Sequence, residues 1–286
     1  FAILTKRLRA ISEIVAEFEK GNLDHRIEIE TKDEFGQLGI AFNSMADRIE
    51  STVEKLRQND TLRRELIANV SHDLRTPLAS IQGYVETILM KSDLDEDRKL
   101  KYLNVILKNT QSLSKQVNEL FELSKLEAKQ ILPNLEPFSI NELTQDVSLK
   151  FKTQFESHKL ELITEIPHDL PSVVGDIAMI ERVIANLIRN ASEFTPSGGR
   201  VTVSIKKRDE SVSVSIEDTG QGISAEDIPY IFDRFYRGGK KTIEGSTSTG
   251  LGLTIASKMI EAHDQTLIVE SELGKGTRFS FELPLS

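Results

Sequence analysis

Apolar residues recur at helical spacing in the first half of the chain and at strand spacing in much of the second half. Within residues 4–20 and again within residues 38–56, apolar positions step alternately by four and three residues, a pattern typical of a coiled-coil seam. Residues 23–29 alternate only weakly, which indicates an extended connector between two short helices. Neither helix can bury its seam alone, so we expect a parallel homodimer.

Helical spacing continues in two longer segments, residues 58–90 and 99–128, each with one apolar stripe. The polar stretch 91–98 between them predicts a turn. The two segments therefore predict an antiparallel helical hairpin, and two copies of the hairpin would form a four-helix bundle. Pro133 and Pro137 mark a linker after the second helix.

After this linker the apolar period changes, and segments with strand alternation are interspersed with segments of helical spacing. The combination predicts an α/β sandwich in which helices pack on one sheet. The expected strands are 160–166, 201–205, 212–217, 267–272 and 277–283, and the expected helices are about 140–155, 177–194 and 251–262.

Composition narrows the classes of function. The 286 residues carry a net charge of -9, and none of them is cysteine. Without a basic surplus, nucleic acid is not the expected partner, and without cysteine there are no disulfides and no thiolate metal sites. The length allows two or three domains.

The start of the chain resembles the end of a membrane anchor. Phe1 to Leu4 are apolar, and Lys6, Arg7 and Arg9 follow. A cut near the cytoplasmic end of a membrane helix would leave such a stub, although an ordinary helix start has the same pattern. We expect the cytoplasmic portion of a cell-membrane protein whose transmembrane segment is absent from this chain.

The octet Ser71-His72-Asp73-Leu74-Arg75-Thr76-Pro77-Leu78 concentrates reactive groups within about two helical turns. His72 and Thr76 share a helix face, as do Asp73 and Thr76, while Pro77 removes a backbone donor and should kink the helix. A neutral imidazole is a nucleophile, Asp73 can orient it and accept its proton, and Thr76 can hold a water. A lone histidine is more often an inert surface residue, but these neighbours favour phosphoryl transfer at His72.

Two later motifs suit a nucleotide. Asn186 and Asn190 share one face of an expected helix, and amide oxygens suit Mg²⁺. Asp218-Thr-Gly220-Gln-Gly222 follows an expected strand, so that the carboxylate can accept a hydrogen bond from an exocyclic amine while the glycines admit a flat ligand. Taken alone, each motif has an ordinary alternative, either solvated asparagines or a turn at the end of a strand.

A glycine-rich segment, residues 245–252, precedes the last expected helix. Backbone N–H groups and the helix dipole can bind phosphate there, with Gly250, Leu251 and Gly252 as candidates. The segment lacks the Lys-Ser/Thr pair of a P-loop. Before it, Phe232 and Phe235 precede a Gly/Lys/Ser/Thr-rich stretch, which predicts a hinged lid or, alternatively, a plain surface loop.

In this order, the motifs resemble the cytoplasmic part of a bacterial sensor histidine kinase of a two-component system. Residues 1–57, with Asp33-Glu34-Phe35-Gly36-Gln37-Leu38, resemble a HAMP signal-relay domain. Residues 58–130 resemble a dimerisation and histidine phosphotransfer domain, and residues 131–286 resemble the ATP-binding domain of the gyrase/Hsp90/histidine-kinase/MutL type. The expected fold is an all-α coiled coil and a four-helix bundle in the dimer, followed by an α/β sandwich.

The resemblance implies roles for the candidate residues. His72 is implied as the phosphoacceptor and Asp73 as its general base, and Thr76 with Asp73 as the pair that dephosphorylates a partner. Asn190 is implied as the Mg²⁺ ligand, with Asn186 in support. The other implied nucleotide-binding residues are Asp218 at the adenine amine, and Gly220, Gly222, Phe232, Phe235, Gly250, Leu251, Gly252 and Thr277.

One position departs from the family pattern. The family commonly has a basic residue three positions after the second asparagine, where it contacts phosphate, and this chain has Glu193. The change removes a cation and adds an anion near ATP. Arg189, Arg234, Arg237 and Lys240 remain open as candidates for the missing charge.

The implied activity is that of an ATP:protein-L-histidine phosphotransferase. His72 takes the γ-phosphoryl group of ATP and passes it to an aspartate in the receiver domain of a response regulator, and helix packing in the HAMP coiled coil relays the signal. Two alternatives stay open: a phosphatase-dominant regulator with weak kinase activity, and a non-catalytic nucleotide-binding adaptor. A clamp ATPase of the same superfold is disfavoured because Asn186 stands where such enzymes carry a glutamate.

Overall fold

The computed structural model describes residues 2–28, 33–91, 94–167, 169–234, 236 and 250–286. The chain forms two compact units, Phe1–His72 and Asp73–Ser286, and each is described by itself. In the described ranges, no helix combines the length and the apolar character needed to cross a membrane.

The N-terminal unit contains helix α1 (Ala2–Glu19) and the start of helix α2 (Glu34–Met90). Phe18 of α1 and Phe42 of α2 meet edge to face, with ring centroids 5.4 Å apart, in a small core that includes Ile27 of the connector. The amide of Asn43 accepts a hydrogen bond from the Ile27 nitrogen and donates one to the Ile27 oxygen, both at 2.9 Å. The connector is therefore fastened to α2 through its own backbone.

Helix α2 unites the two helical segments predicted at residues 38–56 and 58–90, because it runs without interruption for 57 residues. No glycine or proline occurs between Ile49 and Val70, so no backbone feature ends a helix there. Pro77 lies inside α2, and the helix continues past it to Met90.

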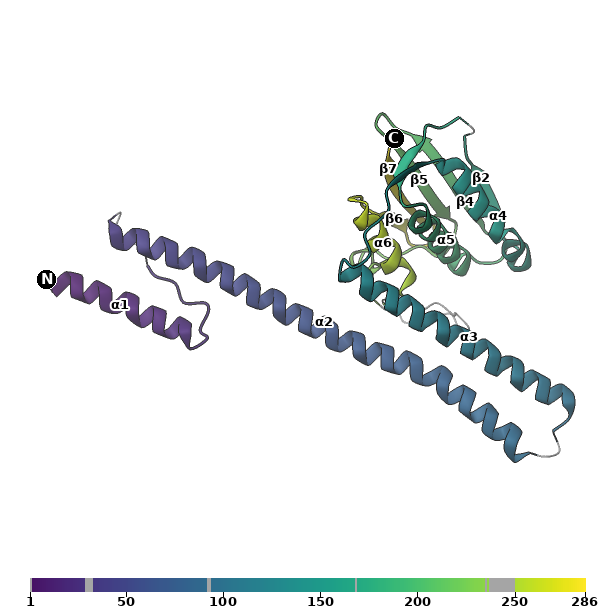
Figure 1. Cartoon of the computed structure of the whole chain (residues 1–286), viewed down its shortest axis with the longest axis horizontal. Helices are drawn as coiled ribbons and strands as arrows, with labels where there is room; N and C mark the ends of the chain where they lie inside the picture. Colours follow the sequence, from purple (N-terminus) through teal and green to yellow (C-terminus); the bar gives the residue numbers. More distant parts are fainter. Residues whose placement is uncertain (1, 29–32, 92–93, 168, 235, 237–249) are drawn as a thin grey trace. The chain divides into compact units, whose positions relative to one another are not determined.

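Helix α3 (Glu96–Glu127) returns alongside the end of α2. The rings of Tyr84 and Tyr102 lie 5.1 Å apart, and the Asn109 amide donates to the Ser80 hydroxyl at 3.0 Å. Because the contacts move down one helix as they move up the other, the two helices are antiparallel (Figure 1). The predicted helical hairpin is confirmed.

The rest of the chain contains a five-stranded sheet in the order β2-β4-β5-β7-β6 and a separate pair, β1 and β3. Pairing in the large sheet is antiparallel except between β2 and β4. The sequence predicted every strand except β1 and β3, which at three residues each are too short to show alternation. The strands are β1 (Glu136–Phe138), β2 (Glu161–Glu165), β3 (Val173–Gly175), β4 (Arg200–Lys207), β5 (Ser211–Asp218), β6 (Ile268–Glu272) and β7 (Gly276–Pro284).

Helices α4 (Ile140–His158), α5 (Ile177–Phe194) and α6 (Gly252–Ala262) pack as a layer against this sheet (Figure 1). The central helix α5 contacts α4, α6, β4 and β5. Alternate residues of β4, β5 and β7 point into the core, among them Val203, Val214 and Phe281, which are fully buried. A short 3-10 helix, η1 (Ile228–Tyr230), precedes α6. The predicted fold class, a helical N-terminal region followed by an α/β sandwich, is confirmed.

Candidate functional site

The predicted phosphotransfer residues lie on one stretch of helix α2. Asp73 is half-buried and Thr76 is exposed, one turn further along. His72 belongs to the helical backbone of α2, and its side chain lies outside the described part of the structure. Helical spacing thus brings the backbone positions of all three predicted residues within about one turn.

The predicted adenine-binding carboxylate lies at the end of the central strand of the large sheet. Asp218 ends β5, and its side chain is 5% exposed. One of its oxygens accepts a hydrogen bond from the Gly220 nitrogen at 2.8 Å. In the sheet register Asp218 pairs with Thr277 of β7, which pairs in turn with Ser271 of β6. The structure therefore brings together Asp218, Gly220 and Thr277 as predicted.

Burial raises the pKa of Asp218 to about 6, and hydrogen bonds from the backbone of Gly220 and Thr277 partly oppose this effect. Removing a carboxylate from water disfavours its charged form. A carboxylate kept buried at this desolvation cost is typical of a site that uses its charge or its acceptor oxygens.

The backbone around Asp218 leaves no room for side chains. A Cβ on Gly220 would lie 2.5 Å from the Phe194 carbonyl oxygen at the end of α5. Gly222, with a φ of +70°, would place a Cβ under 3.0 Å from the Glu272 backbone. The motif therefore sits tightly between α5 and β6, and it can take this path only with glycine at both positions.

Two residues near Asp218 were not predicted from the sequence as part of this site. The Ser271 hydroxyl accepts from the Ile223 nitrogen at 2.8 Å, donates to the Gly276 oxygen at 2.9 Å, and lies 2.9 Å from the Thr277 hydroxyl. Gly276 has a φ of +121° and backs directly onto the Asp218 carbonyl. Ser271 carries no signal beyond strand alternation, whereas Gly274-Lys-Gly276 before a strand could have indicated a special backbone.

The predicted phosphate-binding and metal-binding residues meet where α5 faces the start of α6. Asn186 is 6% exposed, and its amide nitrogen donates to the Gly252 oxygen at 3.2 Å. Gly250 has a φ of +69° and Leu251 is buried, so this turn directs the N-terminus of α6 toward α5. Asn190, one turn after Asn186, is half-buried and forms no side-chain hydrogen bond with a described residue. Its amide oxygen is a donor atom that suits Mg²⁺.

The predicted aromatic residues fall partly outside the described residues. Phe232 packs edge to face on Phe279 of β7, with ring centroids 6.3 Å apart. Phe235 and the predicted lid, residues 237–249, lie outside the described ranges. Next to them, the Tyr236 hydroxyl donates to Asp227 at 2.5 Å, and this hydrogen bond raises the pKa of Tyr236 to about 12.

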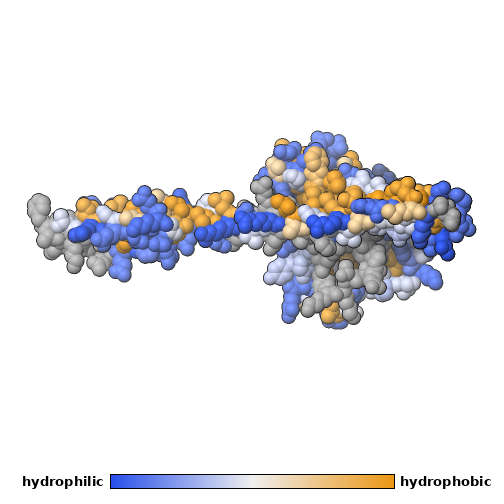
Figure 2. All heavy atoms as spheres, turned by 90° about the horizontal axis from the view of Figure 1, so that it is seen from below, coloured by the Kyte–Doolittle hydropathy of each residue, from blue (hydrophilic) through white to orange (hydrophobic). Residues whose placement is uncertain are grey.

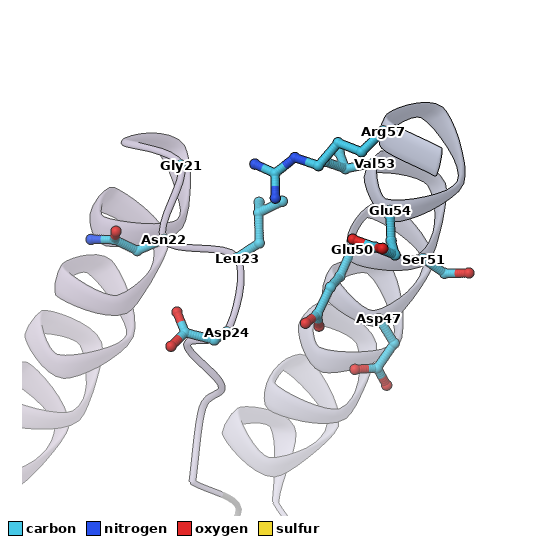
Figure 3. Close-up of a pocket in the computed structure, with 10 residues that line it drawn as sticks. All are labelled: Gly21, Asn22, Leu23, Asp24, Asp47, Glu50, Ser51, Val53, Glu54 and Arg57. Atoms are coloured by element: carbon cyan, nitrogen blue, oxygen red, sulfur yellow. The ribbon is translucent and has the colours of Figure 1, made fainter. Parts of the chain in front are cut away.

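A separate open groove lies in the N-terminal unit, between the end of α1, the connector and α2 (Figure 3). Its lining includes Asp24, Asp47, Glu50 and Arg57. Arg26 forms ion pairs with both Asp47 and Glu50. None of the predicted site residues lines this groove, so we assign it no part in the chemistry.

Models of three protein families match the chain. A model described as "Histidine kinase-, DNA gyrase B-, and HSP90-like ATPase" matches residues 175–286. A model described as "His Kinase A (phospho-acceptor) domain" matches residues 62–129, and the "HAMP domain" model matches residues 2–51. The matched ranges follow the order of the three predicted domains.

Two sensor kinases of Bacillus subtilis are similar in sequence. The sensor histidine kinase YclK is 32% identical over 282 residues, which are 98% of this chain and 59% of YclK. The sensor histidine kinase WalK is 34% identical over 270 residues, which are 90% of this chain and 44% of WalK. The chain thus spans about half the length of these relatives.

Two solved structures share the fold. The histidine kinase ThkA in complex with the response regulator protein TrrA has a TM-score of 0.65 and 28% identity, over 82% of this chain and 65% of that one. The Acinetobacter baumannii histidine kinase AdeS has a TM-score of 0.60 and 27% identity, over 75% of this chain and 98% of that one. From the matched domains and these relatives, the chain belongs to the sensor histidine kinases, with HAMP and phospho-acceptor helices followed by an ATPase domain of the gyrase/Hsp90/histidine-kinase/MutL type.

Proposed function

We propose that this chain transfers the γ-phosphoryl group of ATP to His72 and then to an aspartate of a response regulator. The observation that carries the proposal is the recessed carboxylate of Asp218, enclosed by backbone that admits only glycine. It lies in a domain matched by an ATPase family, in the same chain as a helix matched by a phospho-acceptor family. One polypeptide would thereby supply both the domain that binds the nucleotide donor and the side chain that accepts the phosphoryl group.

In the nucleotide site, Asp218 accepts a hydrogen bond from the adenine amine, and Thr277 lies beside it. Gly220 and Gly222 let the backbone follow the flat base. The N–H groups at Gly250, Leu251 and Gly252 face the phosphates at the start of α6. Phe232 and Phe235 form the aromatic support of the lid.

Asn190, supported by Asn186, is the proposed Mg²⁺ ligand. The fit rests on the amide oxygen of Asn190, which no described side chain engages, on the same helix face as an asparagine that contacts Gly252. When bound, Mg²⁺ neutralises charge on the phosphate oxygens. The two asparagines hold their amides toward the phosphates, because α5 is packed in the core.

At the acceptor, an imidazole nitrogen of His72 attacks the γ-phosphorus in line. The N–P bond forms as the P–O bond to ADP breaks, and Asp73 takes up the proton that the other ring nitrogen loses. The phosphoryl group then passes from His72 to a carboxylate of the regulator. ThkA has been solved with the response regulator TrrA, which supports a partner of this class.

We further propose that the chain acts as a homodimer. Exposed apolar side chains gather along the helical part of the chain (Figure 2). On α3 the exposed residues Leu103, Leu107, Val117 and Phe121 step by four, ten and four, which keeps them on one helix face. A second hairpin packed on this face would complete a four-helix bundle.

The proposed domain boundaries are residues 1–57 for the HAMP signal relay, 58–130 for dimerisation and phosphotransfer, and 131–286 for ATP binding. The HAMP match and the sensor relatives support attachment to the cell membrane by a segment outside this sequence. Signals arriving there would change helix packing in the dimer and so the access of the ATPase domain to His72.

A second activity, dephosphorylation of the regulator, is favoured by the spacing of Asp73 and Thr76 on α2. One turn apart, their oxygens can hold a water in line with a phosphoaspartate. Thr76→Ala should keep autophosphorylation and lose regulator dephosphorylation. Equal loss of both activities would exclude this role.

The main test is autophosphorylation of the full chain with ATP labelled at the γ-phosphate. The wild type should gain label that is stable in base and labile in acid, and His72→Gln should reduce it to background. His158→Gln, at the exposed end of α4, is the matched control and should label normally. Label that persists in His72→Gln would contradict the proposal.

A further inference from the structure

Four cations remained open as substitutes for the basic residue that the family places at the position of Glu193. Arg237 and Lys240 lie outside the described residues. Arg234 forms an ion pair with Glu127 of α3, with 2.5 Å between Nη2 and Oε1. Its charge is therefore already neutralised by a carboxylate. Arg189 has a different environment.

Arg189 lies inside the proposed phosphate site. Its guanidinium donates to the Oδ1 atom of Asn186, whose own amide nitrogen donates to the Gly252 oxygen at 3.2 Å. A Cβ placed on Gly252 would lie 3.9 Å from Nη2 of Arg189. The guanidinium thus stands beside the first residue of α6, between that helix start and the asparagine face of α5.

Two positive groups lie close together there, the guanidinium of Arg189 and the N-terminal end of α6. The cap position of α6 is Leu251, whose side chain makes no capping hydrogen bond. Within the described residues, Arg189 has no carboxylate partner within 4.0 Å, and its hydrogen bond goes to a neutral amide. A half-buried guanidinium next to a positive helix end is favourable only when an anion joins them.

Glu193 lies one helical turn beyond Arg189 but forms no ion pair with it within 4.0 Å in the described structure. Burial raises the pKa of its carboxyl, while the charges of Arg189 and of Lys115 on α3 oppose the rise and Glu119 adds to it. Glu193 therefore lies in the field of Arg189 and of charged groups on α3 without making a direct contact that would hold the guanidinium.

We propose that Arg189 is the cation that binds the polyphosphate of the nucleotide, replacing the basic residue that the family carries at position 193. The inference rests on the proposed ATP site and names a further binding residue within it. In the absence of nucleotide, the Asn186 amide holds the guanidinium in place. When phosphate oxygens arrive, the guanidinium turns from that amide to them, since a charged acceptor forms the stronger hydrogen bond.

The test compares ligands that differ in phosphate content, using the full chain. Mg²⁺–ADP and the β,γ-imido analogue of ATP are titrated by calorimetry, and adenosine binding is followed by ligand-observed NMR. Arg189→Gln should weaken both phosphorylated ligands by about 10- to 100-fold, the loss of one or two charge-assisted hydrogen bonds. Adenosine should bind as it does to the wild type, and Arg189→Lys should recover part of the lost affinity.

Arg208→Gln is the matched control, because Arg208 is exposed in the turn between β4 and β5 and carries the same charge. It should bind all three ligands as the wild type does. If Arg189→Gln binds ADP with wild-type affinity while Asp218→Asn does not, Arg189 has no phosphate role and the ATP site stands. If Arg189→Gln loses adenosine equally, its role is structural and the inference is wrong. If the folded wild type binds no nucleotide, the proposed function fails together with this inference.

Discussion

The helical region and the sheet domain differ in how far one chain buries their apolar residues. In the sheet domain, the inner faces of β4, β5, β7 and α5 close on one another, and side chains such as Phe281 are fully buried within one chain. In the helical region, residues such as Leu107 and Val117 remain exposed. The sheet domain therefore buries its apolar residues within one chain, whereas in the proposed dimer a second copy would bury the apolar face of the helices.

The two candidate sites differ in the same way. The phosphotransfer octet is contiguous and needs only helical geometry to bring His72, Asp73 and Thr76 onto neighbouring positions. The proposed nucleotide site combines segments from α5, the end of β5, the start of α6 and the β6–β7 hairpin. A surface site on a helix can tolerate changes in tertiary packing. A site assembled from separate helices and strands loses its geometry when their packing changes.

The largest expected effect breaks dimerisation without touching the sheet domain. In Leu107→Glu, each copy would place a carboxylate in the apolar face between the hairpins, where burying an unpaired charge is strongly unfavourable. We expect the dimer dissociation constant, measured by analytical ultracentrifugation, to rise by at least about 100-fold. The affinity for ADP should stay unchanged, because the pocket lies within one sheet domain.

Leu149→Glu on α4 is the control, since Leu149 is 61% exposed and Leu107 is 55% exposed. The two variants add the same charge at equally accessible leucines, but only Leu107 belongs to the helical hairpin. Equal effects of the two variants on dimerisation would refute the contrast between the regions.

The next effect tests how far the nucleotide pocket depends on backbone packing. Gly276 and Gly274 both have positive φ, +121° and +80°, but a Cβ on Gly274 meets nothing within 4 Å while one on Gly276 collides with the Asp218 backbone. Gly274→Ala should cost about 1 kcal/mol for the left-handed backbone alone. Gly276→Ala should cost about 3 kcal/mol or more, because the strands must also separate.

Urea denaturation of the two glycine variants measures both costs, and ADP titration measures the pocket. Gly276→Ala should also weaken ADP binding, because separating β5 from β7 moves Asp218 away from Thr277. Gly274→Ala should bind ADP normally. Equal stabilities of the two variants would mean that the backbone contact at Asp218 is not a constraint.

Contiguous features of both regions were predictable from the sequence, and long-range ones were not. The octet, the limits of α5 and the five strands of the large sheet follow from local spacing. The hydrogen bond of Asn186 to Gly252 joins residues 66 positions apart, and that of Ile223 to Ser271 joins residues 48 positions apart. Nothing in either local sequence signals such a contact.

The continuity of α2 past residue 57 has a local cause. The apolar spacing was assigned to two helical segments, residues 38–56 and 58–90. The steps of four and three residues that reach Leu56 lead on, ten residues later, to Leu66 and then to Val70. With neither glycine nor proline between Ile49 and Val70, the stripe and the helix continue together through this region.

The smallest expected effect concerns the charge of Asp218, the buried carboxylate of the proposed nucleotide site. With a pKa of about 6, Asp218 is ionised at pH 7.5 and mostly protonated at pH 5. Because a protonated carboxyl presents a weaker acceptor to the adenine amine, the affinity for ADP should fall about tenfold between these two pH values. Asp218→Asn keeps an acceptor oxygen that does not titrate, so its affinity should change less with pH, by the amount due to ADP and other groups.

Stability should respond in the opposite direction. The pKa of Asp218 is raised in the folded state relative to 3.8 in the unfolded state, so the folded state binds the extra proton between these values. Its contribution to stability is therefore fully present below pH 4 and is lost as pH rises through about 6. The difference in urea midpoint between Asp218→Asn and the wild type should grow over this window. If the affinity for ADP is highest at the pH values where the ionised Asp218 lowers the stability of the fold, the charge of Asp218 serves ligand binding. Parallel trends of affinity and stability with pH would contradict this interpretation.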